Sequence, residues 1–246
     1  GQFSAYLYNT SNIRVERNSG TTNVWITWQV IECFNGEFYV YRGSQSYSGS
    51  TTTYTVNIGG TVNGSNCLTW VDGATNDQAS ISYVSQSFFT AEISSGLQTT
   101  FTLKREAAGT ASGTARWIVV EFNLNKIDSI QTGETTVTTQ TQSSRRTVAI
   151  SAVDTTDSIL LFQIRSSANG LMQLSIAGAL DSATQISFYA HATNSYTRYI
   201  RWYVIDFGSG CGSKQNGQID KSADTAWYDI DQTLTEINQS RTISFV

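Results

Sequence analysis

The sequence has no proline, one histidine, three cysteines and few charged residues, and each shortage narrows what the protein can do. Charged residues make up 14% of the chain and the net charge is −4, so the chain lacks the clustered Lys and Arg that a phosphate-binding face needs. No apolar run approaches the ~20 residues of a membrane span. We therefore expect no nucleic-acid partner and no membrane insertion.

The scarcity of histidine and cysteine limits catalysis and metal binding. His191 is the only histidine, and no Gly-x-Ser-x-Gly elbow occurs. Cys33, Cys67 and Cys211 match neither a zinc site nor a CxxC redox motif, and their disulfide pairing stays open. Two carboxylates could still converge in space as they do in glycoside hydrolases. We nevertheless predict no enzyme, no catalytic residue, no cofactor and no metal, because copies of one small domain rarely build a single active site.

The chain contains an internal repeat that is marked by tryptophan. The motif Trp-x-Val-[Ile/Val]-[Glu/Asp]-Phe begins at Trp117 and at Trp202, and a version with one extra residue begins at Trp28. The tryptophans are 89 and 85 residues apart. Self-similarity at a fixed period predicts a tandem array of small domains.

Alternating apolar and polar residues, with Ser, Thr, Asn and Gly between the apolar segments, predict an all-β fold of tandem six-stranded antiparallel β-sandwich repeats. The chain divides into a C-terminal half-repeat, two complete repeats and an N-terminal half-repeat. Their bounds are 1–34, 35–122, 123–207 and 208–246. The strands expected in the complete repeats are 38–41, 54–58, 67–71, 82–93, 100–105 and 115–122, then 135–141, 146–151, 158–165, 172–180, 185–190 and 199–207.

The repeats align closely in sequence. Thr55–Ile58 matches Thr147–Ile150, and Cys67–Trp70 matches Ile159–Phe162 without a gap. Three further segments match one another, each with a small residue at its centre. We expect these small residues, Ala5, Ala91 and Gly178, to make room for the tryptophan of the last strand.

The half-repeats at the two ends would make a third domain that lacks the strand equivalent to residues 158–165. Unpaired buried backbone groups cost about 1–3 kcal/mol each, so the halves should not stand alone. They could close on each other in one chain as a ring, complete each other between chains in a polymer, or belong to a longer array; the missing strand favours the last two. The residues expected to carry assembly are Phe3, Ala5, Leu7, Ile243 and Phe245.

Acidic residues recur four positions after each tryptophan, at Glu32, Glu121 and Asp206. They could form a repeated calcium position, but no Asp-x-Asp-x-Asp spacing surrounds them. We interpret them, with Trp28, Trp117 and Trp202, as structural residues of the repeat, whose carboxylates bond to a neighbouring backbone turn. We also interpret Arg17 and Arg105 as structural residues, at a loop or an interface.

Tyrosines that we expect to be exposed alternate with apolar positions or lie near loops. Aromatic side chains surrounded by Asn, Gln and Ser bind sugars, and they also make subunit interfaces. The sequence does not separate these two uses. The tyrosines concerned are Tyr6, Tyr8, Tyr39, Tyr41, Tyr189, Tyr196, Tyr199 and Tyr203.

A six-strand repeat that ends in this tryptophan motif resembles tandem repeats of large bacterial and phage surface proteins and, more weakly, the H-type lectin domain. The resemblance implies β-sandwiches that oligomerise and sometimes bind glycans; no sugar-binding residue of the lectin family has a counterpart here. We predict an extracellular, cell-surface or virion-surface structural protein whose subunits assemble with one another into a filament or virion appendage. The alternative is a glycan-binding or receptor-binding module whose partner is a cell-surface glycan.

Overall fold

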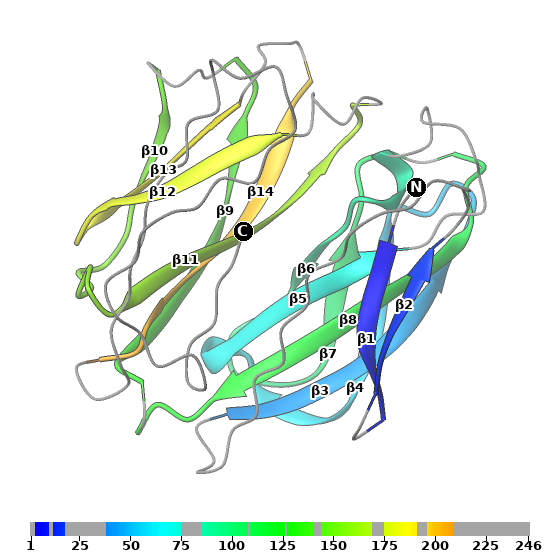
Figure 1. The fold of residues 1–246 in the computed structure, drawn as a ribbon, viewed down its shortest axis with the longest axis horizontal. Helices are drawn as coiled ribbons and strands as arrows, with labels where there is room; N and C mark the ends of the chain where they lie inside the picture. The colour runs from blue at the N-terminus through cyan, green and yellow to red at the C-terminus, as the bar shows by residue number, and fades with distance from the viewer. Residues whose placement is uncertain are drawn as a thin grey trace.

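The structure is a computed structural model, and it is all-β and antiparallel. It describes residues 3–9, 12–17, 38–74, 85–107, 109–125, 127–139, 144–168, 175–190 and 196–208, the first two ranges by their backbone alone. These ranges contain fourteen strands and no α-helix (Figure 1). The strands are β1 (Phe3–Asn9), β2 (Asn12–Arg17), β3 (Phe38–Tyr47), β4 (Thr53–Asn63), β5 (Cys67–Ala74), β6 (Thr90–Glu92), β7 (Leu97–Lys104), β8 (Gly113–Phe122), β9 (Ser129–Val137), β10 (Arg146–Ala149), β11 (Ser158–Ser166), β12 (Ile176–Ser182), β13 (Gln185–Ala190) and β14 (Arg198–Asp206).

The two central sets of six strands have the same topology. Strands β3 to β8 form the sheets β3-β8-β5 and β4-β7-β6. Strands β9 to β14 form the equivalent sheets β9-β14-β11 and β10-β13-β12. In each set the last strand lies at the centre of one sheet, which explains why its sequence, from Trp117 or Trp202 onward, is the most apolar of the repeat.

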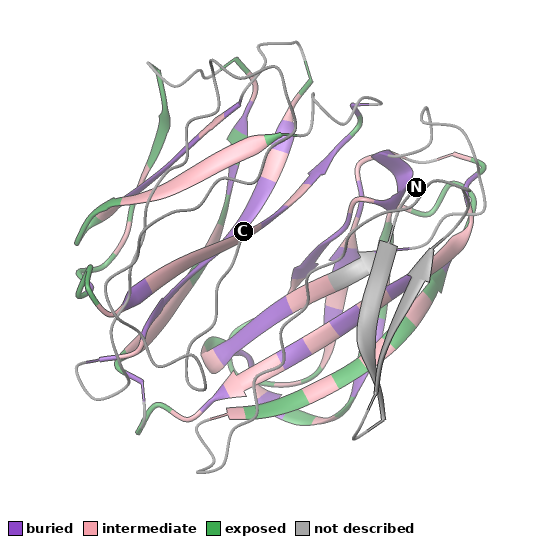
Figure 2. Cartoon of the chain, viewed as in Figure 1, coloured by how far each residue is buried: buried purple, intermediate pink, exposed green. Residues whose placement is uncertain are grey.

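Each pair of sheets encloses its own hydrophobic core. The first core combines Val119 of β8 with Phe101 and Leu103 of β7, and all three are buried. The second combines Val204 of β14 with Phe188 of β13 in the same way. Along β8, buried positions alternate with half-buried ones, as the pleat of a strand with one face toward a core requires (Figure 2). Strands β3 to β8 and strands β9 to β14 therefore each form a β-sandwich.

Each tryptophan of the repeat motif packs on a glycine of the neighbouring strand. Gly43 lies opposite Trp117, and Gly133 lies opposite Trp202. A Cβ atom built on either glycine would lie 2.5 Å from Cζ2 of the indole, which is closer than real Cβ atoms come. The tryptophan therefore requires glycine at this place in both sandwiches.

The expected role of the small residues in β6 and β12 is wrong for Gly178. A Cβ atom on Gly178 would meet Phe162 at 2.8 Å and Phe188 at 2.9 Å, not the tryptophan. Gly178 lies in the sheet opposite that of Trp202, where the two phenyl rings, 5.4 Å apart, occupy the space above it. The repeat alignment identified Gly178 as the small residue, but its neighbours are the two phenyl rings and not the tryptophan.

Some predicted strand positions are also wrong. The strand expected at 135–141 begins earlier, as β9 at Ser129, and only Thr90–Glu92 of the strand expected at 82–93 is a described strand. The gap-free alignment of β5 with β11 is off by one residue: Trp117 pairs with Val71 and Trp202 with Phe162, so Val71, not Trp70, is equivalent to Phe162. The cause is an extension of β4 to Asn63 with an irregularity after Asn57, whereas β10 ends at Ala149.

The hairpin of β1 and β2 has the register of the hairpins β6-β7 and β12-β13. Ala5 pairs with Val15, as Ala91 pairs with Leu103 and as Gly178 pairs with Phe188. Strands β1 and β2 are therefore a third copy of this pair of strands. Trp28 and Glu32 lie outside the described residues, as do Ile243 and Phe245 of the predicted assembly set; Phe3, Ala5 and Leu7 lie in β1.

The contact between glycine and tryptophan predicts the effect of adding one methyl group. Gly43→Ala should lower the free energy of unfolding by about 1–3 kcal/mol, because the new Cβ atom overpacks the indole of Trp117. Ser44→Ala, a change at the exposed neighbouring residue, should stay within ~0.5 kcal/mol of the parent. Urea unfolding of the three proteins measures both effects. Equal midpoints for all three would show that the glycine is dispensable.

Candidate functional site

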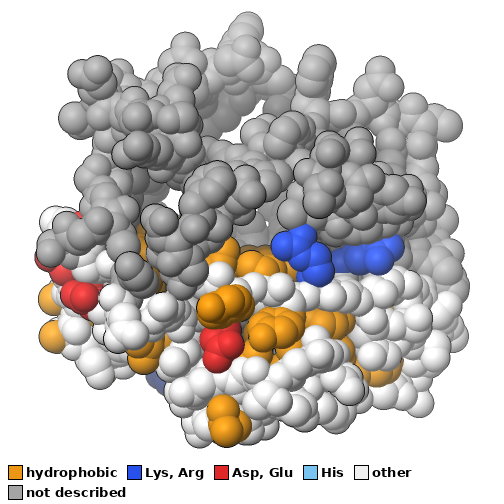
Figure 3. Space-filling model, turned by 90° about the horizontal axis from the view of Figure 1, so that it is seen from below, with side chains coloured by type: hydrophobic (Ala, Val, Ile, Leu, Met, Phe, Trp, Pro, Cys, Tyr) orange, Lys and Arg blue, Asp and Glu red, His pale blue; other side chains and the backbone are white. Residues whose placement is uncertain are grey.

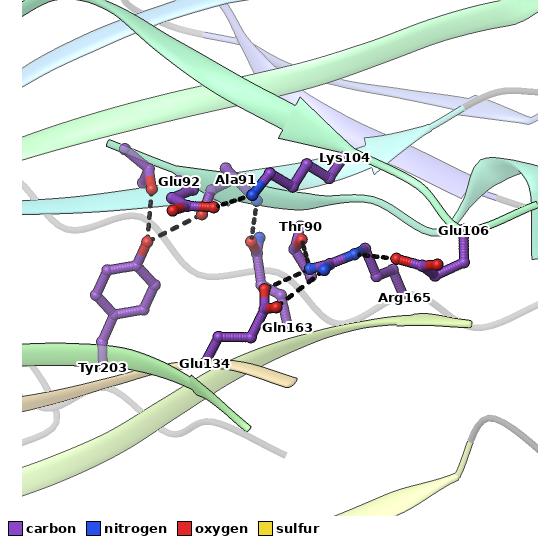
Figure 4. Close-up of polar contacts among 10 residues, drawn as sticks. Thr90, Ala91, Glu92, Lys104, Glu106, Glu134, Gln163, Arg165 and Tyr203 are labelled. Carbon is purple, nitrogen blue, oxygen red and sulfur yellow. Dashed lines mark hydrogen bonds and ion pairs between the residues drawn. The ribbon is translucent and has the colours of Figure 1, made fainter. Parts of the chain in front are cut away.

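The most elaborate polar arrangement among the described residues lies between the two sandwiches, at what we call the junction (Figure 4). The junction has an apolar part, in which Leu68 of β5 and Phe122 of β8 cluster with Tyr203 and Ile205 of β14. All four side chains are buried. Sheets β3-β8-β5 and β9-β14-β11 therefore each have a second apolar face outside their own core.

The polar part of the junction supplies hydrogen-bond partners for backbone groups at the edge of a sheet. Strand β6 is the edge of its sheet, so the backbone groups of Ala91 that point away from β7 have no partner within the sheet. The N–H of Ala91 donates to Oε1 of Gln163 at 3.0 Å, and the C=O of Ala91 accepts from the hydroxyl of Tyr203 at 3.1 Å. Two side chains of the second sandwich thus take the place of a neighbouring strand.

The Tyr203 hydroxyl joins three strands. Besides bonding Ala91 in β6, it lies 2.5 Å from Oγ1 of Thr69 in β5. Strands β5 and β6 are edges of different sheets of the first sandwich, so the phenol of β14 bonds both of them at once. Tyr203 and Thr69 are both fully buried, which makes these hydrogen bonds costly to lose.

Arg165 of β11 carries the charge of the junction. Its guanidinium donates to both oxygens of Glu134 in β9, at 2.6 and 3.0 Å. It also donates to Glu106 of the first sandwich at 2.7 Å and to the hydroxyl of Thr90 in β6 at 2.8 Å. Its side chain is 5% exposed. Burial lowers the pKa of Arg165, but the hydrogen bonds and the negative charges of Glu134 and Glu106 together raise the pKa above its ordinary value. The cation therefore binds one carboxylate from each sandwich.

A second ion pair lies beside the first. Nζ of Lys104 donates to Glu92 at 2.5 Å. Burial alone would raise the pKa of Glu92, but the hydrogen bond from Lys104 and the positive charges of Arg201, Lys104 and Arg165 lower it. Both members of the pair belong to the first sandwich and are about one-third exposed, so the pair contributes little stability.

The N-terminal hairpin makes an equivalent contact on the first sandwich. Strand β1, the copy of β6, lies against β5 (Figure 1). Strand β6 itself lies against β11, the copy of β5. The same edge therefore packs on the next repeat twice within the described chain. A contact between different surfaces of equivalent units is heterologous.

The recurring acids Glu121 and Asp206 bond to backbone turns. Oε1 of Glu121 accepts from the N–H of Asn63 at 2.7 Å, and Oδ2 of Asp206 accepts from the N–H of Asp154 at 2.9 Å. Asn63 and Asp154 are equivalent residues, since each stands four positions before the start of the next strand and accepts the N–H two residues on. Each carboxylate therefore ties the last strand to the same turn, as the structural interpretation expects.

Arg105 and Cys67 are also enclosed by the first sandwich. Arg105 is 1% exposed and donates to the carbonyls of Thr51, Gln86 and Gly49 at 2.8–2.9 Å. The backbone alone is described for Arg17. Burial, and then the charge of Glu121, raise the pKa of the Cys67 thiol to about 12.

The tyrosines fall into different environments. Tyr39 is 61% exposed and Tyr196 is 36% exposed, but Tyr203 is buried, so the expectation of an exposed ring is wrong for Tyr203. Tyr41, Tyr189 and Tyr199 are half-buried. Sequence reasoning placed Tyr203 among surface residues because a phenol on the outer face of a sheet has the same pattern whether it meets water or another domain.

Tyr39 lines a shallow surface pocket of about 350 Å³. The start of β3 and the end of β8 lie at the bottom of Figure 1, and Figure 3 shows the molecule from that side, where hydrophobic and acidic side chains lie close together. The pocket presents a ring, amides and one carboxylate. Its lining residues are Tyr39, Asn66, Glu121, Phe122, Asn123, Leu124 and Asn125.

The sequence did not identify four residues of the junction, namely Gln163, Arg165, Glu134 and Thr69. Each lies in a predicted strand or in the span before one. In the other repeat, the residue at the equivalent position has a different chemical type. The available signal was polarity: Gln163 and Arg165 interrupt the apolar run of β11, and an internal polar residue needs a buried partner.

Comparison of the chain with protein-family models, with curated proteins and with solved structures finds no match. Among the described residues, no group of three or more Cys, His, Asp or Glu side chains could hold a metal ion. The same part of the chain has no helix that is long and apolar enough to cross a membrane.

The junction predicts a specific cost for removing one hydroxyl. Tyr203→Phe should lower the free energy of unfolding by about 1–3 kcal/mol, because the C=O of Ala91 is left buried without its donor. Tyr39→Phe, at an exposed ring, is the matched control and should cost less than ~0.5 kcal/mol.

A double-mutant cycle with Thr69→Ala isolates the bond between the two hydroxyls. Denaturant unfolding of the four proteins should show a coupling energy of ~0.5 kcal/mol or more. Additive effects of the two substitutions would contradict the direct contact.

Proposed function

We propose that the protein is a non-enzymatic structural protein, a subunit of an extracellular filament or virion appendage. In this proposal the sandwiches stack head to tail, and half-domains of neighbouring copies complete each other. The observation that carries it is the repeated contact of an edge strand with the next repeat, β1 on β5 and β6 on β11. Heterologous contacts that do not close on themselves build filaments.

The outer edge of β12 supports this proposal. Strand β12 is the copy of β6, and Ala177 occupies the place of Thr90, which contacts Arg165 of the next sandwich. Thr90 is 1% exposed, whereas Ala177 is half-buried. In a head-to-tail stack, the edge of β12 would be covered by the next copy as β6 is covered by β11.

Assembly of the untagged chain, followed by electron microscopy and light scattering, tests the proposal. We expect fibres that lengthen with protein concentration, and we expect Ala177→Lys to abolish them by placing a charge in the contact. Ala149→Lys is the matched control, because Ala149 is an exposed alanine in β10, the opposite edge of the same sheet. A monomer that persists at every concentration, or equal effects of the two substitutions, would overturn the proposal.

The pocket at Tyr39 favours a second function, the binding of a cell-surface glycan. An exposed ring beside amides and a carboxylate suits the apolar face and hydroxyls of a sugar, and ~300–1,000 Å³ is the usual size of small-ligand sites. A glycan array should show saturable binding that Tyr39→Ala removes and Tyr196→Ala preserves. The absence of any glycan bound by the parent chain would exclude this function.

A further inference from the structure

The equivalent acids Glu121 and Asp206 differ in what their second carboxylate oxygen does. In the second sandwich both oxygens of Asp206 accept hydrogen bonds from the backbone. Its Oδ2 accepts from the N–H of Asp154 at 2.9 Å, and its Oδ1 accepts from the N–H of Gly208 at 3.2 Å. Asp206 is 5% exposed. The whole carboxylate of Asp206 therefore serves the fold.

Glu121 serves the fold with one oxygen. Its Oε1 accepts from the N–H of Asn63 at 2.7 Å, which is the equivalent of the bond between Asp206 and Asp154. Its Oε2 accepts no hydrogen bond from the part of the chain that the structure describes. Glu121 is half-buried and lines the surface pocket beside Tyr39, at the end of the sandwich that Figure 3 shows. Glu121 therefore has an acceptor to offer to a ligand.

The ring beside this acceptor is not required by the fold. Tyr39 lies opposite Glu121 in the register of β3 and β8, and Ser129 lies opposite Asp206 in the register of β9 and β14. The same sheet thus forms in the second sandwich with a serine at the place of the ring. Tyr39 is 61% exposed, so its ring contributes little to a core. The exposed ring and the available carboxylate oxygen occur together in the first sandwich, where they line one pocket.

We propose that Oε2 of Glu121 accepts hydrogen bonds from the hydroxyl groups of a sugar without an acidic group, whose apolar face lies against the ring of Tyr39. This inference rests on the second proposed function, the binding of a cell-surface glycan, and adds the class of sugar and the residue that selects it. An ionised carboxylate only accepts hydrogen bonds, and sugar hydroxyls are donors. The same negative charge disfavours an acidic sugar in this place, because like charges that face each other are repelled.

A glycan array of matched pairs tests the class of sugar with the parent chain. Each pair contains a glycan that ends in glucose or galactose and the same glycan that ends in the corresponding uronic acid, so its members differ only at C6 of the last ring. We expect the uronic acid member to bind at least about tenfold more weakly. Stronger binding of the uronic acids would overturn the inference and leave glycan binding in place. The absence of binding to every member would overturn both.

Substitution of the carboxylate tests the role of Glu121. Glu121→Gln keeps an oxygen that can accept from Asn63 but removes the charge, so it should lower the affinity for the bound neutral glycan about tenfold, measured by titration calorimetry. Asp206→Asn is the matched control, because it makes the same change at the equivalent position of the second sandwich, and it should leave the affinity unchanged. Equal affinities of Glu121→Gln and the parent would show that Glu121 does not contact the sugar.

The salt dependence of binding to the parent chain gives an answer even if Glu121→Gln does not fold. Salt screens the repulsion between a carboxylate of the protein and one of the sugar. The affinity for the uronic acid member should therefore rise with salt concentration, and the affinity for the neutral member should stay constant. An affinity for the uronic acid that falls with salt would mean that a cation binds it, which would contradict the proposed selection by Glu121.

Discussion

An antiparallel sheet of three strands ends in two rows of unpaired N–H and C=O groups, and the arrangement of the two sandwiches depends on how one such row is satisfied. At β6 the backbone of Ala91 bonds the side chains of Gln163 and Tyr203. Side chains can replace a strand only if they lie in a fixed position, and the apolar contact between Leu68 and Ile205 with its neighbours holds them there. The backbone of one repeat is therefore completed by the next.

Buried charge at the junction gives specificity more than stability. Arg165 is enclosed and bound to Glu106 and Glu134, so its charge is neutralised by one carboxylate from each side. Buried ion pairs often contribute little net stability, because desolvation offsets the attraction, but an unpaired partner is costly. Loss of the Glu106 carboxylate would leave the buried Arg165 cation without its acidic partner from the first sandwich. The two carboxylates therefore help to fix how the two sandwiches meet at Arg165.

The sequence predicted the all-β class, the six-strand repeat and most strands, because alternation and the tryptophan motif are local signals. It failed where a residue's role depends on another repeat. Gln163 and Arg165 resembled ordinary polar residues of a strand, and Tyr203 resembled a surface ring. The predicted alignment of β5 with β11 was wrong because one extra residue between Asn57 and Asn63 of β4 moves the equivalence of every later residue of β5 by one. The sequence of a strand does not show which residues of another repeat pack on its outer face.

The most direct test of the junction is native-state hydrogen exchange at the amide of Ala91. An edge-strand amide that pointed into water would exchange rapidly, whereas an amide that donates to Gln163 at a buried contact opens only when the two sandwiches separate. We predict that the Ala91 amide exchanges as slowly as the amides in the centre of β7. Exchange at the rate of the exposed loop amide of Ser95 would contradict the account, because the edge of β6 would then be open to solvent.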